Sequence, residues 1–203
     1  KEFNTTGSCN PEWHYMVDTS AKLAKIEEYI DDGLYFTINR ARQFGKTTTL
    51  KALYRRLLDR YHVIPISFEV GGVVNDKVED FCRNFEFKMS KAGGMTSEQS
   101  DFWLNKDKST SLEELSLKIT TYCKLQSKPV LLLIDEVDKS TNNQLFLDFL
   151  GMLRNNYLDR DINGLNSTFH SVILAGVYDV KNLKLKIRPE SEQKYNSPWN
   201  IAI

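Results

Sequence analysis

The chain has 203 residues, of which 41% are hydrophobic and 27% are charged, an ordinary composition for one α/β domain with a sizeable core. Lysine and arginine number 27 together, as do aspartate and glutamate, so the formal net charge is zero. This balance excludes a molecule-wide field that would draw the protein to nucleic acid or to a membrane surface, although a local basic patch remains compatible with it.

The three cysteines, Cys9, Cys82 and Cys123, stand far apart, lack the spacing of a metal site and are odd in number. This pattern favours reduced thiols over a disulfide framework. No apolar run in the sequence is long enough to cross a bilayer, and no signal peptide is recognisable. We therefore expect a cytoplasmic protein that makes no membrane contact.

Residues 1–34 are predicted to form an irregular lead-in and a helix that packs on the rest of the chain. The capping residues at 18–20 start this helix, and apolar residues at helical spacing continue it to Ile30. Gly33 suits its C-terminal stop. Tyr15–Val17 are candidates for an adenine pocket, with ordinary core packing as the alternative.

Residues Tyr35–Leu50, YFTINRARQFGKTTTL, have the layout of a phosphate-binding loop between a strand and a helix. Tyr35–Asn39 predicts a short strand, and an amphipathic helix is predicted from Lys46 to Tyr61. Backbone N–H groups at such a helix N-terminus face an anion, and the helix dipole adds positive potential there. The residues expected to contact a nucleotide are Arg40, Arg42, Gln43, Phe44, Gly45, Lys46, Thr47 and Thr48.

Individual roles within this loop follow from side-chain chemistry. Lys46 can reach the β- and γ-phosphates, and the Thr47 hydroxyl can ligate Mg²⁺. Gly45 lets the backbone approach the phosphates without a Cβ in the way. Arg40 replaces the first glycine of the usual GxxxxGK[ST] pattern, so the loop is expected to be wider or to take another path; Arg40 and Arg42 either bring charge to the phosphates or face solvent. On this motif alone, a capped helix with a surface lysine remains the alternative.

A second strand and a helix follow. Val63–Val70 reads as the strand, and Pro65, which lacks an N–H donor, argues for an edge or strand-start position. Asp76–Lys91 carries apolar residues at helical spacing and predicts a helix.

The next segment, residues 92–110, is polar and contains Gly93-Gly94, so it is predicted to be a mobile loop. Trp103 is its one large apolar anchor. Ser111–Glu114 then matches a capping box, and the helix that it opens is expected to continue to about Leu125.

A second motif lies in Pro129–Lys139, PVLLLIDEVDK. Val130–Ile134 is a continuous apolar run, as expected for a parallel strand covered on both faces. It ends in Asp135 and Glu136, and two carboxylates at the end of a buried strand are costly unless they meet a cation or a positive site. Ligands of open α/β sheets bind at that end. Asp135 is therefore expected to hold Mg²⁺, and Glu136 to orient or deprotonate an attacking water.

The C-terminal part predicts one more helix and two strands. Asn142–Leu158 is strongly helical, Ser171–Val177 is another buried strand, and the apolar tail Trp199–Ile203 can form a last strand. Asp179 and Asn182, which follow the Ser171–Val177 strand, are candidate sensors of the γ-phosphate.

The segment KNLKLKIR that ends at Arg188 is basic. Arg188 can stabilise transition-state charge in its own chain or in a neighbouring copy. A solvated basic segment is the alternative, and nucleic-acid binding through this cluster also stays open.

Several motifs together carry a family resemblance over nearly the whole chain. They are Phe3-Asn4, HYMVD at 14–18, NRARQFGKTTTL, LLLIDEVD, VILAGVYDVKNLKLKIR and KYNSPWNIA. The combination resembles the bacterial AAA-ATPase-like family, whose members often carry a PD-(D/E)XK nuclease-like domain at the C-terminus. That family's own P-loop variant resembles NRPRxFGKT, so Arg40 matches it and Ala41 stands in place of its proline.

The resemblance implies an ATP-binding core that uses Mg²⁺, with Lys46, Thr47, Asp135 and Glu136 in the roles given above. The fold class expected is α/β, a three-layer α/β/α P-loop sandwich with a mostly parallel five-stranded sheet. By analogy with ATPases that carry a catalytic glutamate, its order is second strand, Asp-Glu strand, Ser171–Val177 strand, P-loop strand and tail strand.

Residues 35–203 are expected to form this ATPase core. The helical lid and the nuclease-like domain are expected to be absent from the chain. For the nuclease-like domain, Glu192–Lys194 has the letters of the motif but lacks the strand context that such a site needs.

Three functions remain open from the sequence: a Mg²⁺-ATP hydrolase that drives an attached effector or partner, a slow nucleotide-gated signalling switch, and an interaction domain with a decayed P-loop. Self-association through the core is a further possibility. The four chemically competent residues, Lys46, Thr47, Asp135 and Glu136, argue against decay.

Overall fold

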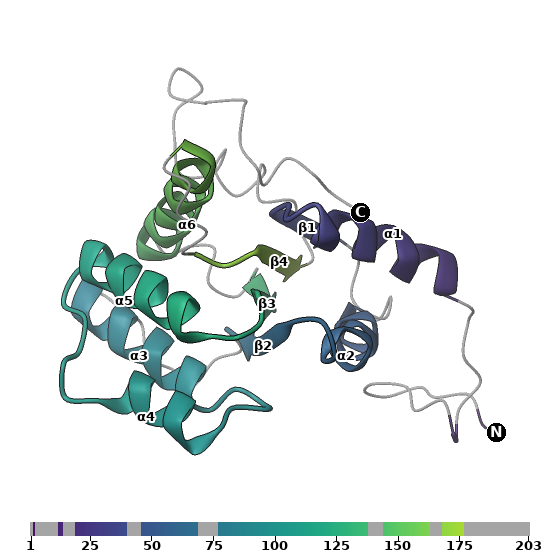
Figure 1. Ribbon diagram of the computed structural model, residues 1–203, viewed down its shortest axis with the longest axis horizontal. Helices are drawn as coiled ribbons and strands as arrows, with labels where there is room; N and C mark the ends of the chain where they lie inside the picture. The colour runs from purple at the N-terminus through teal and green to yellow at the C-terminus, as the bar shows by residue number, and fades with distance from the viewer. Residues whose placement is uncertain are drawn as a thin grey trace.

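The structure, a computed structural model, describes residues 2, 12–13, 19–39, 46–68, 77–137, 144–162 and 168–176. These ranges contain the elements α1 Ser20–Asp31, β1 Phe36–Asn39, α2 Lys46–Leu57, β2 His62–Ser67, α3 Val78–Ser90, α4 Ser97–Leu104, α5 Leu112–Leu125, β3 Val130–Asp135, α6 Gln144–Ile162 and β4 Ser171–Gly176 (Figure 1). None of the helices in these ranges is long and apolar enough to cross a membrane.

The described strands form one parallel sheet in the order β1-β4-β3-β2. This order is the predicted one for these strands, and the predicted fifth strand, Trp199–Ile203, lies outside the described residues. Within the described sheet β2 is an edge strand, which suits Pro65 because proline has no N–H to give to a second neighbour. Pro65 pairs in register with Leu133 of β3.

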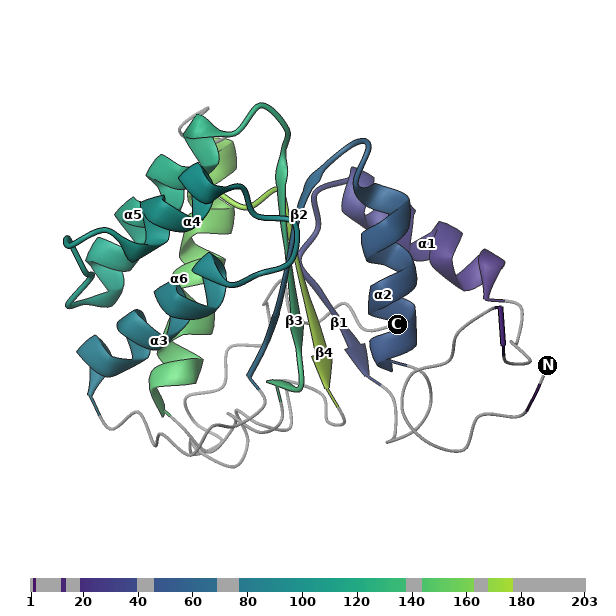
Figure 2. The ribbon, with the colours of Figure 1, turned by 90° about the horizontal axis from the view of Figure 1, so that it is seen from below.

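Helices cover both faces of the sheet, giving three layers (Figure 2). Helices α1 and α2 lie on one face; α3, α5 and α6 lie on the other, and α4 packs against α3. Burial on both faces explains why β3 is apolar from Val130 to Ile134. Leu131 and Leu133 are buried toward α1 and α2, whereas Leu132 and Ile134 are buried on the opposite side. Successive strand side chains alternate between faces, so a strand in a middle layer needs apolar residues at every position.

The segment 92–110, predicted as a mobile loop, contains helix α4. A capping box starts this helix: Gln99 N–H donates to Thr96 Oγ1 at 3.2 Å, and Thr96 N–H donates to Gln99 Oε1 at 2.9 Å. Trp103 is fully buried and anchors the helix to the core. The loop prediction was therefore wrong for α4, because a reciprocal cap and one buried indole stabilise a helix in a mostly polar segment.

The start of α5 differs in detail from the predicted capping box. Glu114 N–H donates to Ser111 Oγ at 3.2 Å, as predicted. The Glu114 carboxylate turns instead to Thr110, accepting from its backbone N–H at 2.7 Å and from its hydroxyl at 2.9 Å. These backbone and hydroxyl hydrogen bonds hold the pKa of Glu114 below its ordinary value.

A buried carboxylate joins α3 to the connection between α4 and α5. Glu86 is fully buried, and its Oε1 accepts from the Ser109 N–H at 3.0 Å and from the Ser109 hydroxyl at 2.7 Å. The ammonium of Lys118 lies 3.1 Å from Oε1, and that of Lys108 lies 3.5 Å from Oε2. Two cations and two hydrogen bonds compensate the cost of removing this charge from water.

At the end of the sheet where β4 begins, side chains hold the turn between α1 and β1. Arg160 donates to the carbonyl of Gly33 at 3.0 Å and to that of His170 at 2.7 Å, and His170 Nε2 donates to the carbonyl of Ile30 at 2.8 Å. Gly33 has φ +66°, and a Cβ there would lie 3.3 Å from the Arg160 guanidinium. These contacts hold the start of β1 beside the start of β4.

Candidate nucleotide-binding site

Strands β1 and β3 end at the same edge of the sheet, and α2 starts from that edge (Figure 2). Asn39 pairs with Gly176 at the end of β1, and Ile134 pairs with Leu174 one residue before Asp135. Ligands of open parallel sheets bind at this edge, where the carboxyl ends of the strands meet. The two sequence motifs are thereby brought together from opposite sides of β4.

A hydrogen bond joins the two motifs directly. Thr47, in the first turn of α2, donates from its hydroxyl to Asp135 Oδ2 at the end of β3, over a distance of 2.8 Å. The two residues are 88 positions apart in the chain. Thr47 is exposed and Asp135 is half-buried.

Asp135 uses its second oxygen to hold the next residue. The backbone N–H of Glu136 donates to Asp135 Oδ1 at 2.9 Å. One carboxylate therefore contacts both the start of α2 and the backbone of the predicted general base. Glu136 itself is half-buried at the end of the strand.

The backbone of Glu136 is left-handed, with φ +57°, and among the described residues no other non-glycine has a positive φ. For an L-residue this conformation costs roughly 1–2 kcal/mol, because Cβ approaches the following carbonyl oxygen. Strained residues of this kind concentrate at functional sites, where surrounding contacts hold them in place. Glu136, the residue with this strained backbone, is also the residue that the sequence predicts to be the general base.

The oxygen atoms at this edge fit Mg²⁺. A hydroxyl and a carboxylate within hydrogen-bonding distance are the hard oxygen donors that this ion prefers, and Mg²⁺ is commonly bound by one or two protein groups together with substrate phosphates and water. Within the described ranges there is no group of three or more His, Cys, Asp or Glu side chains arranged to hold a metal ion. Thr47 and Asp135 are two oxygen donors of the kind that Mg²⁺ uses in this way.

Sequence reasoning overlooked one neighbour of the site. Ser67, the last residue of β2, pairs in register with Asp135. The register between β2 and β3 places Ser67, which carries a hydroxyl, at this edge, and that register cannot be read from the residues of one strand.

The described ranges include only part of the predicted site. Thr48 lies in the first turn of α2 beside Thr47, and Lys46 begins that helix. The predicted position of the Lys46 ammonium remains untested. The predicted nucleotide contacts, sensors and arginine that lie outside the described residues are Arg40, Arg42, Gln43, Phe44, Gly45, Tyr15–Val17, Asp179, Asn182 and Arg188.

Comparisons with known proteins point to one family. The family model for an AAA-like domain matches residues 7–183 of the chain. No match was found among curated proteins. The matched segment contains both motifs of the candidate site and all four described strands.

Solved structures share the fold at low sequence identity. A Walker-type ATPase of Pyrococcus abyssi aligns with a TM-score of 0.57 and 17% identity, covering 98% of this chain and 54% of its own. The Orc1 protein of Aeropyrum pernix, solved in complex with DNA, aligns with a TM-score of 0.55 and 12% identity, covering 93% of this chain and 45% of its own. This chain thus spans about half the length of each structure, and identities this low establish the shared ATPase fold alone.

Proposed function

The chain belongs to the AAA-like domain family, and on that premise we propose that it binds ATP with Mg²⁺ and hydrolyses it. The observation that carries the proposal is the 2.8 Å hydrogen bond from Thr47 to Asp135, which joins the phosphate-loop helix to the acidic strand end. Either motif alone is also compatible with a purely structural role. Their direct contact at the ligand-binding edge of a parallel sheet is what a shared nucleotide and metal would require.

Thr47 and Asp135 would hold the metal. The chemistry that Mg²⁺ would supply there is neutralisation of the charge that develops on the β- and γ-phosphates. Lys46 would bring an ammonium to the same phosphates, and the preceding loop, Arg40–Gly45, would supply backbone N–H groups and two guanidinium groups.

Glu136 would act as the general base. Its carboxylate follows Asp135 at the strand end, where it can accept a proton from a water aligned with the γ-phosphate. The hydrogen bond of 2.9 Å between the Glu136 N–H and Asp135 supports this role, because it fixes the base relative to the metal-binding carboxylate. Arg188 would stabilise transition-state charge, from the same chain or from a second copy.

The cycle of binding and hydrolysis would drive or gate an attached effector or partner. A C-terminal nuclease-like domain is one such effector in the family that the sequence resembles.

Isothermal titration with ATP and Mg²⁺ tests the binding step. We expect Lys46→Ala to weaken ATP binding by roughly 10- to 100-fold, since a hydrogen bond to a charged group contributes about 1.5–3 kcal/mol. Thr47→Ala should weaken binding in Mg²⁺ more than in EDTA. Thr121→Ala, an exposed threonine of α5, is the matched control. Binding that is absent in the parent chain, or that survives Lys46→Ala unchanged, rejects the proposal in favour of an interaction domain.

Phosphate release tests the chemical step. Glu136→Gln keeps the side-chain volume and removes the base, so we expect turnover to fall by about 10²- to 10⁴-fold while ATP binding persists. An unchanged rate would show that Glu136 has been assigned wrongly. Tight ATP binding with negligible turnover in the parent chain would favour the slow signalling switch instead.

A further inference from the structure

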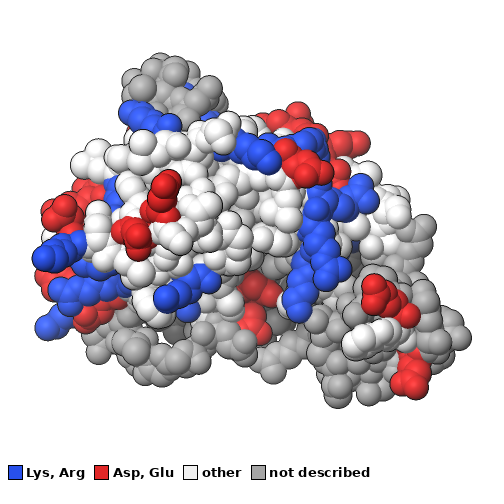
Figure 3. Space-filling model, turned by 60° about the horizontal axis from the view of Figure 1, so that its bottom comes forward, with Lys and Arg blue, Asp and Glu red and all other residues white. Residues whose placement is uncertain are grey.

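One surface of the molecule concentrates positive charge, although the chain as a whole is neutral. In α3, every charged side chain from Arg83 to Lys91 that reaches solvent is positive, because Glu86 is fully buried. In α2, no acidic residue occurs before Asp59, which follows the helix. Figure 3 shows a stripe of Lys and Arg side chains on the face that it presents, with Asp and Glu side chains at its upper end and beside it and further Lys and Arg side chains set apart from it.

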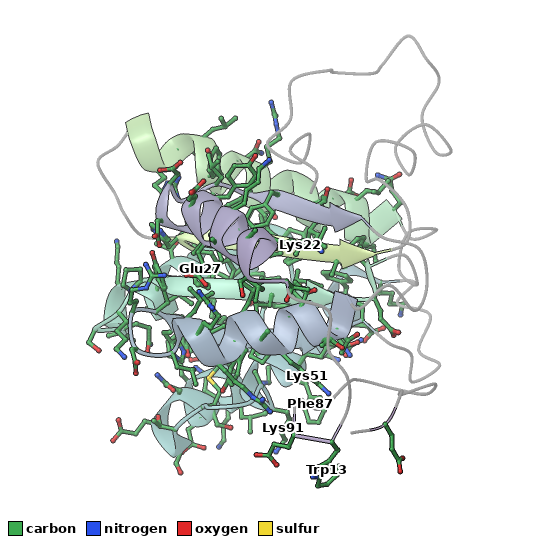
Figure 4. The ribbon with its side chains drawn as sticks, turned by 90° about the vertical axis from the view of Figure 1, so that its right-hand side faces the viewer. Trp13, Lys22, Glu27, Lys51, Phe87 and Lys91 are labelled. Carbon is green, nitrogen blue, oxygen red and sulfur yellow. The ribbon has the colours of Figure 1, made fainter. Side chains whose placement is uncertain are left out.

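The two basic helix faces meet across the edge strand β2. The turn after α3 contains Gly94, where an added Cβ would lie 2.6 Å from the hydroxyl of Tyr54 in α2; at Gly93 it would lie 4.0 Å from Pro65 of β2. The turn therefore passes over the edge of β2 and reaches the helix on the other face of the sheet. Figure 4 shows Lys51 of α2, Phe87 of α3 and Lys91, the residue after α3, on the same side of α2. Arg55 lies one helical turn after Lys51, Tyr54 of the same helix faces the turn at Gly94, and Lys88 follows Phe87. We call these six residues, Lys51, Tyr54, Arg55, Phe87, Lys88 and Lys91, the β2-edge surface.

An exposed aromatic ring lies among these cations. Phe87 is 54% exposed, whereas most phenylalanines of the described ranges are in the core. The Lys91 ammonium lies 5.9 Å from the centroid of the Phe87 ring. Lys88, the next residue along α3, extends toward the ring of Phe68, with its ammonium 5.8 Å from that centroid. Phe87 thus presents an uncovered aromatic surface bordered by positive charge.

This combination selects among anionic partners. Cations alone suit any phosphate backbone, duplex or single-stranded, as well as an acidic peptide. An exposed ring adds binding energy only where the partner has unstacked aromatic groups, and single-stranded nucleic acid presents a base beside every phosphate. We propose that the β2-edge surface binds single-stranded nucleic acid, with Lys51, Arg55 and Lys91 on phosphates and Phe87 stacked on a base.

The proposal does not depend on ATP hydrolysis, because none of these side chains belongs to the candidate nucleotide site. The test is accordingly made without nucleotide, as fluorescence anisotropy of a labelled oligothymidine of about 20 nucleotides, longer than a typical single-strand site. An unlabelled duplex and polyglutamate serve as competitors. Circular dichroism and thermal melting verify that each variant is folded.

Two variants separate charge from stacking. Arg55→Glu combined with Lys91→Glu should weaken binding at least tenfold and flatten the dependence of affinity on salt, because each lost phosphate contact reduces the slope by about 0.7. Phe87→Ser should weaken single-strand binding roughly tenfold, as expected for the loss of one stacked base, with little change in the salt slope. The matched controls are Lys25→Glu with Lys124→Glu for charge and Leu117→Ser for an exposed apolar side chain, and both should leave affinity unchanged.

Three results would overturn the proposal. The first is no binding of the oligothymidine by the parent chain, and the second is equal weakening by the control variants. The third is competition by duplex or polyglutamate as strong as that by unlabelled single strand, which would make the surface a general anion site. Loss of ATP binding by Lys46→Ala with unchanged oligonucleotide affinity would show the two sites to be separate.

Discussion

Glu136 combines a proposed chemical role with an unfavourable backbone conformation. Its φ of +57° lies in the region that glycine adopts without steric cost. The hydrogen bond of its N–H to Asp135 is a local contact that holds this conformation. Glutamate occupies this position although glycine would fit the backbone better.

We therefore predict a reversal of the usual ranking of alanine and glycine at this position. Both Glu136→Ala and Glu136→Gly remove the carboxylate, but only alanine keeps the Cβ, so the glycine variant should have the higher free energy of unfolding by about 1 kcal/mol. Urea denaturation of the two proteins measures the difference. At Glu113, which is exposed in the first turn of α5, the alanine variant should instead be more stable than the glycine variant. The usual ranking at both positions would contradict a strained Glu136.

Two histidines make stability depend on pH. Burial lowers the pKa of His62, with a contribution from Lys128. Burial also lowers the pKa of His170, assisted by Arg160 and opposed by the Ile30 carbonyl and Asp31. In both cases the unfolded chain binds a proton at a higher pH than the folded protein does.

Stability should consequently fall as pH is lowered through about 6.5, the ordinary histidine value, because the unfolded state takes up protons first. The fall should continue down to the depressed folded pKa values. Replacing both His62 and His170 by glutamine, which still offers an N–H donor, should flatten this dependence between neutral and mildly acidic pH. Chemical denaturation of both proteins across that interval measures it, and an equally steep fall in the double variant would disprove the assignment.

At the scale of elements, Glu86 connects α3 to α5 and to the segment between α4 and α5 through side chains. Glu86→Ala should destabilise the fold by roughly 3 kcal/mol, because it leaves the ammonium groups of Lys108 and Lys118 without their buried counter-charge. Glu79→Ala, in the exposed first turn of the same helix, is the matched control and should change stability by less than about 0.5 kcal/mol. Equal effects of the two substitutions in guanidinium denaturation would refute the connection.

The elements also show what the sequence can and cannot predict. Strands such as β3 were predictable because a buried parallel strand must be apolar at every position, and the nearness of the two motifs is what the shared carboxyl edge implies; the direct hydrogen bond from Thr47 to Asp135 was not predicted. Helix α4 was missed because its residues are mostly polar, although Thr96 and Gln99 have capping-box spacing. Glu86 could not be recognised as buried, because its partners come from other segments of the chain. For the same reason, neither the left-handed Glu136 nor the pairing of Ser67 follows from one strand's residues.

At the scale of the whole molecule, two hydrophobic layers share one sheet. Leu53 of α2 belongs to the layer with α1, and Phe149 of α6 belongs to the layer with α3 and α5; both side chains are fully buried. Since neighbouring residues of the same strands enter both layers, we expect neither layer to persist without the other. The described domain should behave as one cooperative unit.

Leu53→Ala and Phe149→Ala should therefore each lower the free energy of unfolding by roughly 3 kcal/mol and shift the same transition. Circular dichroism follows the helices of both layers, whereas tryptophan fluorescence follows Trp103 on the α3 side once Trp13 and Trp199 have been replaced by phenylalanine. The two probes should give coincident curves for both variants. A Leu53→Ala curve that moves by circular dichroism but not by fluorescence would show that the layers unfold separately.

The position of β4 between β1 and β3 has a consequence for how the protein is made. Within the described sheet, β1 has no hydrogen-bonded neighbour except β4, so the strand that leads toward α2 and Thr47 is paired only after Ser171–Gly176 has emerged from the ribosome. A nascent chain thus already carries both halves of the proposed nucleotide site before the sheet between them is complete. ATP in the cell would accordingly meet a receptive molecule only near the end of translation of this segment, and it would protect finished chains while leaving stalled ones to proteases.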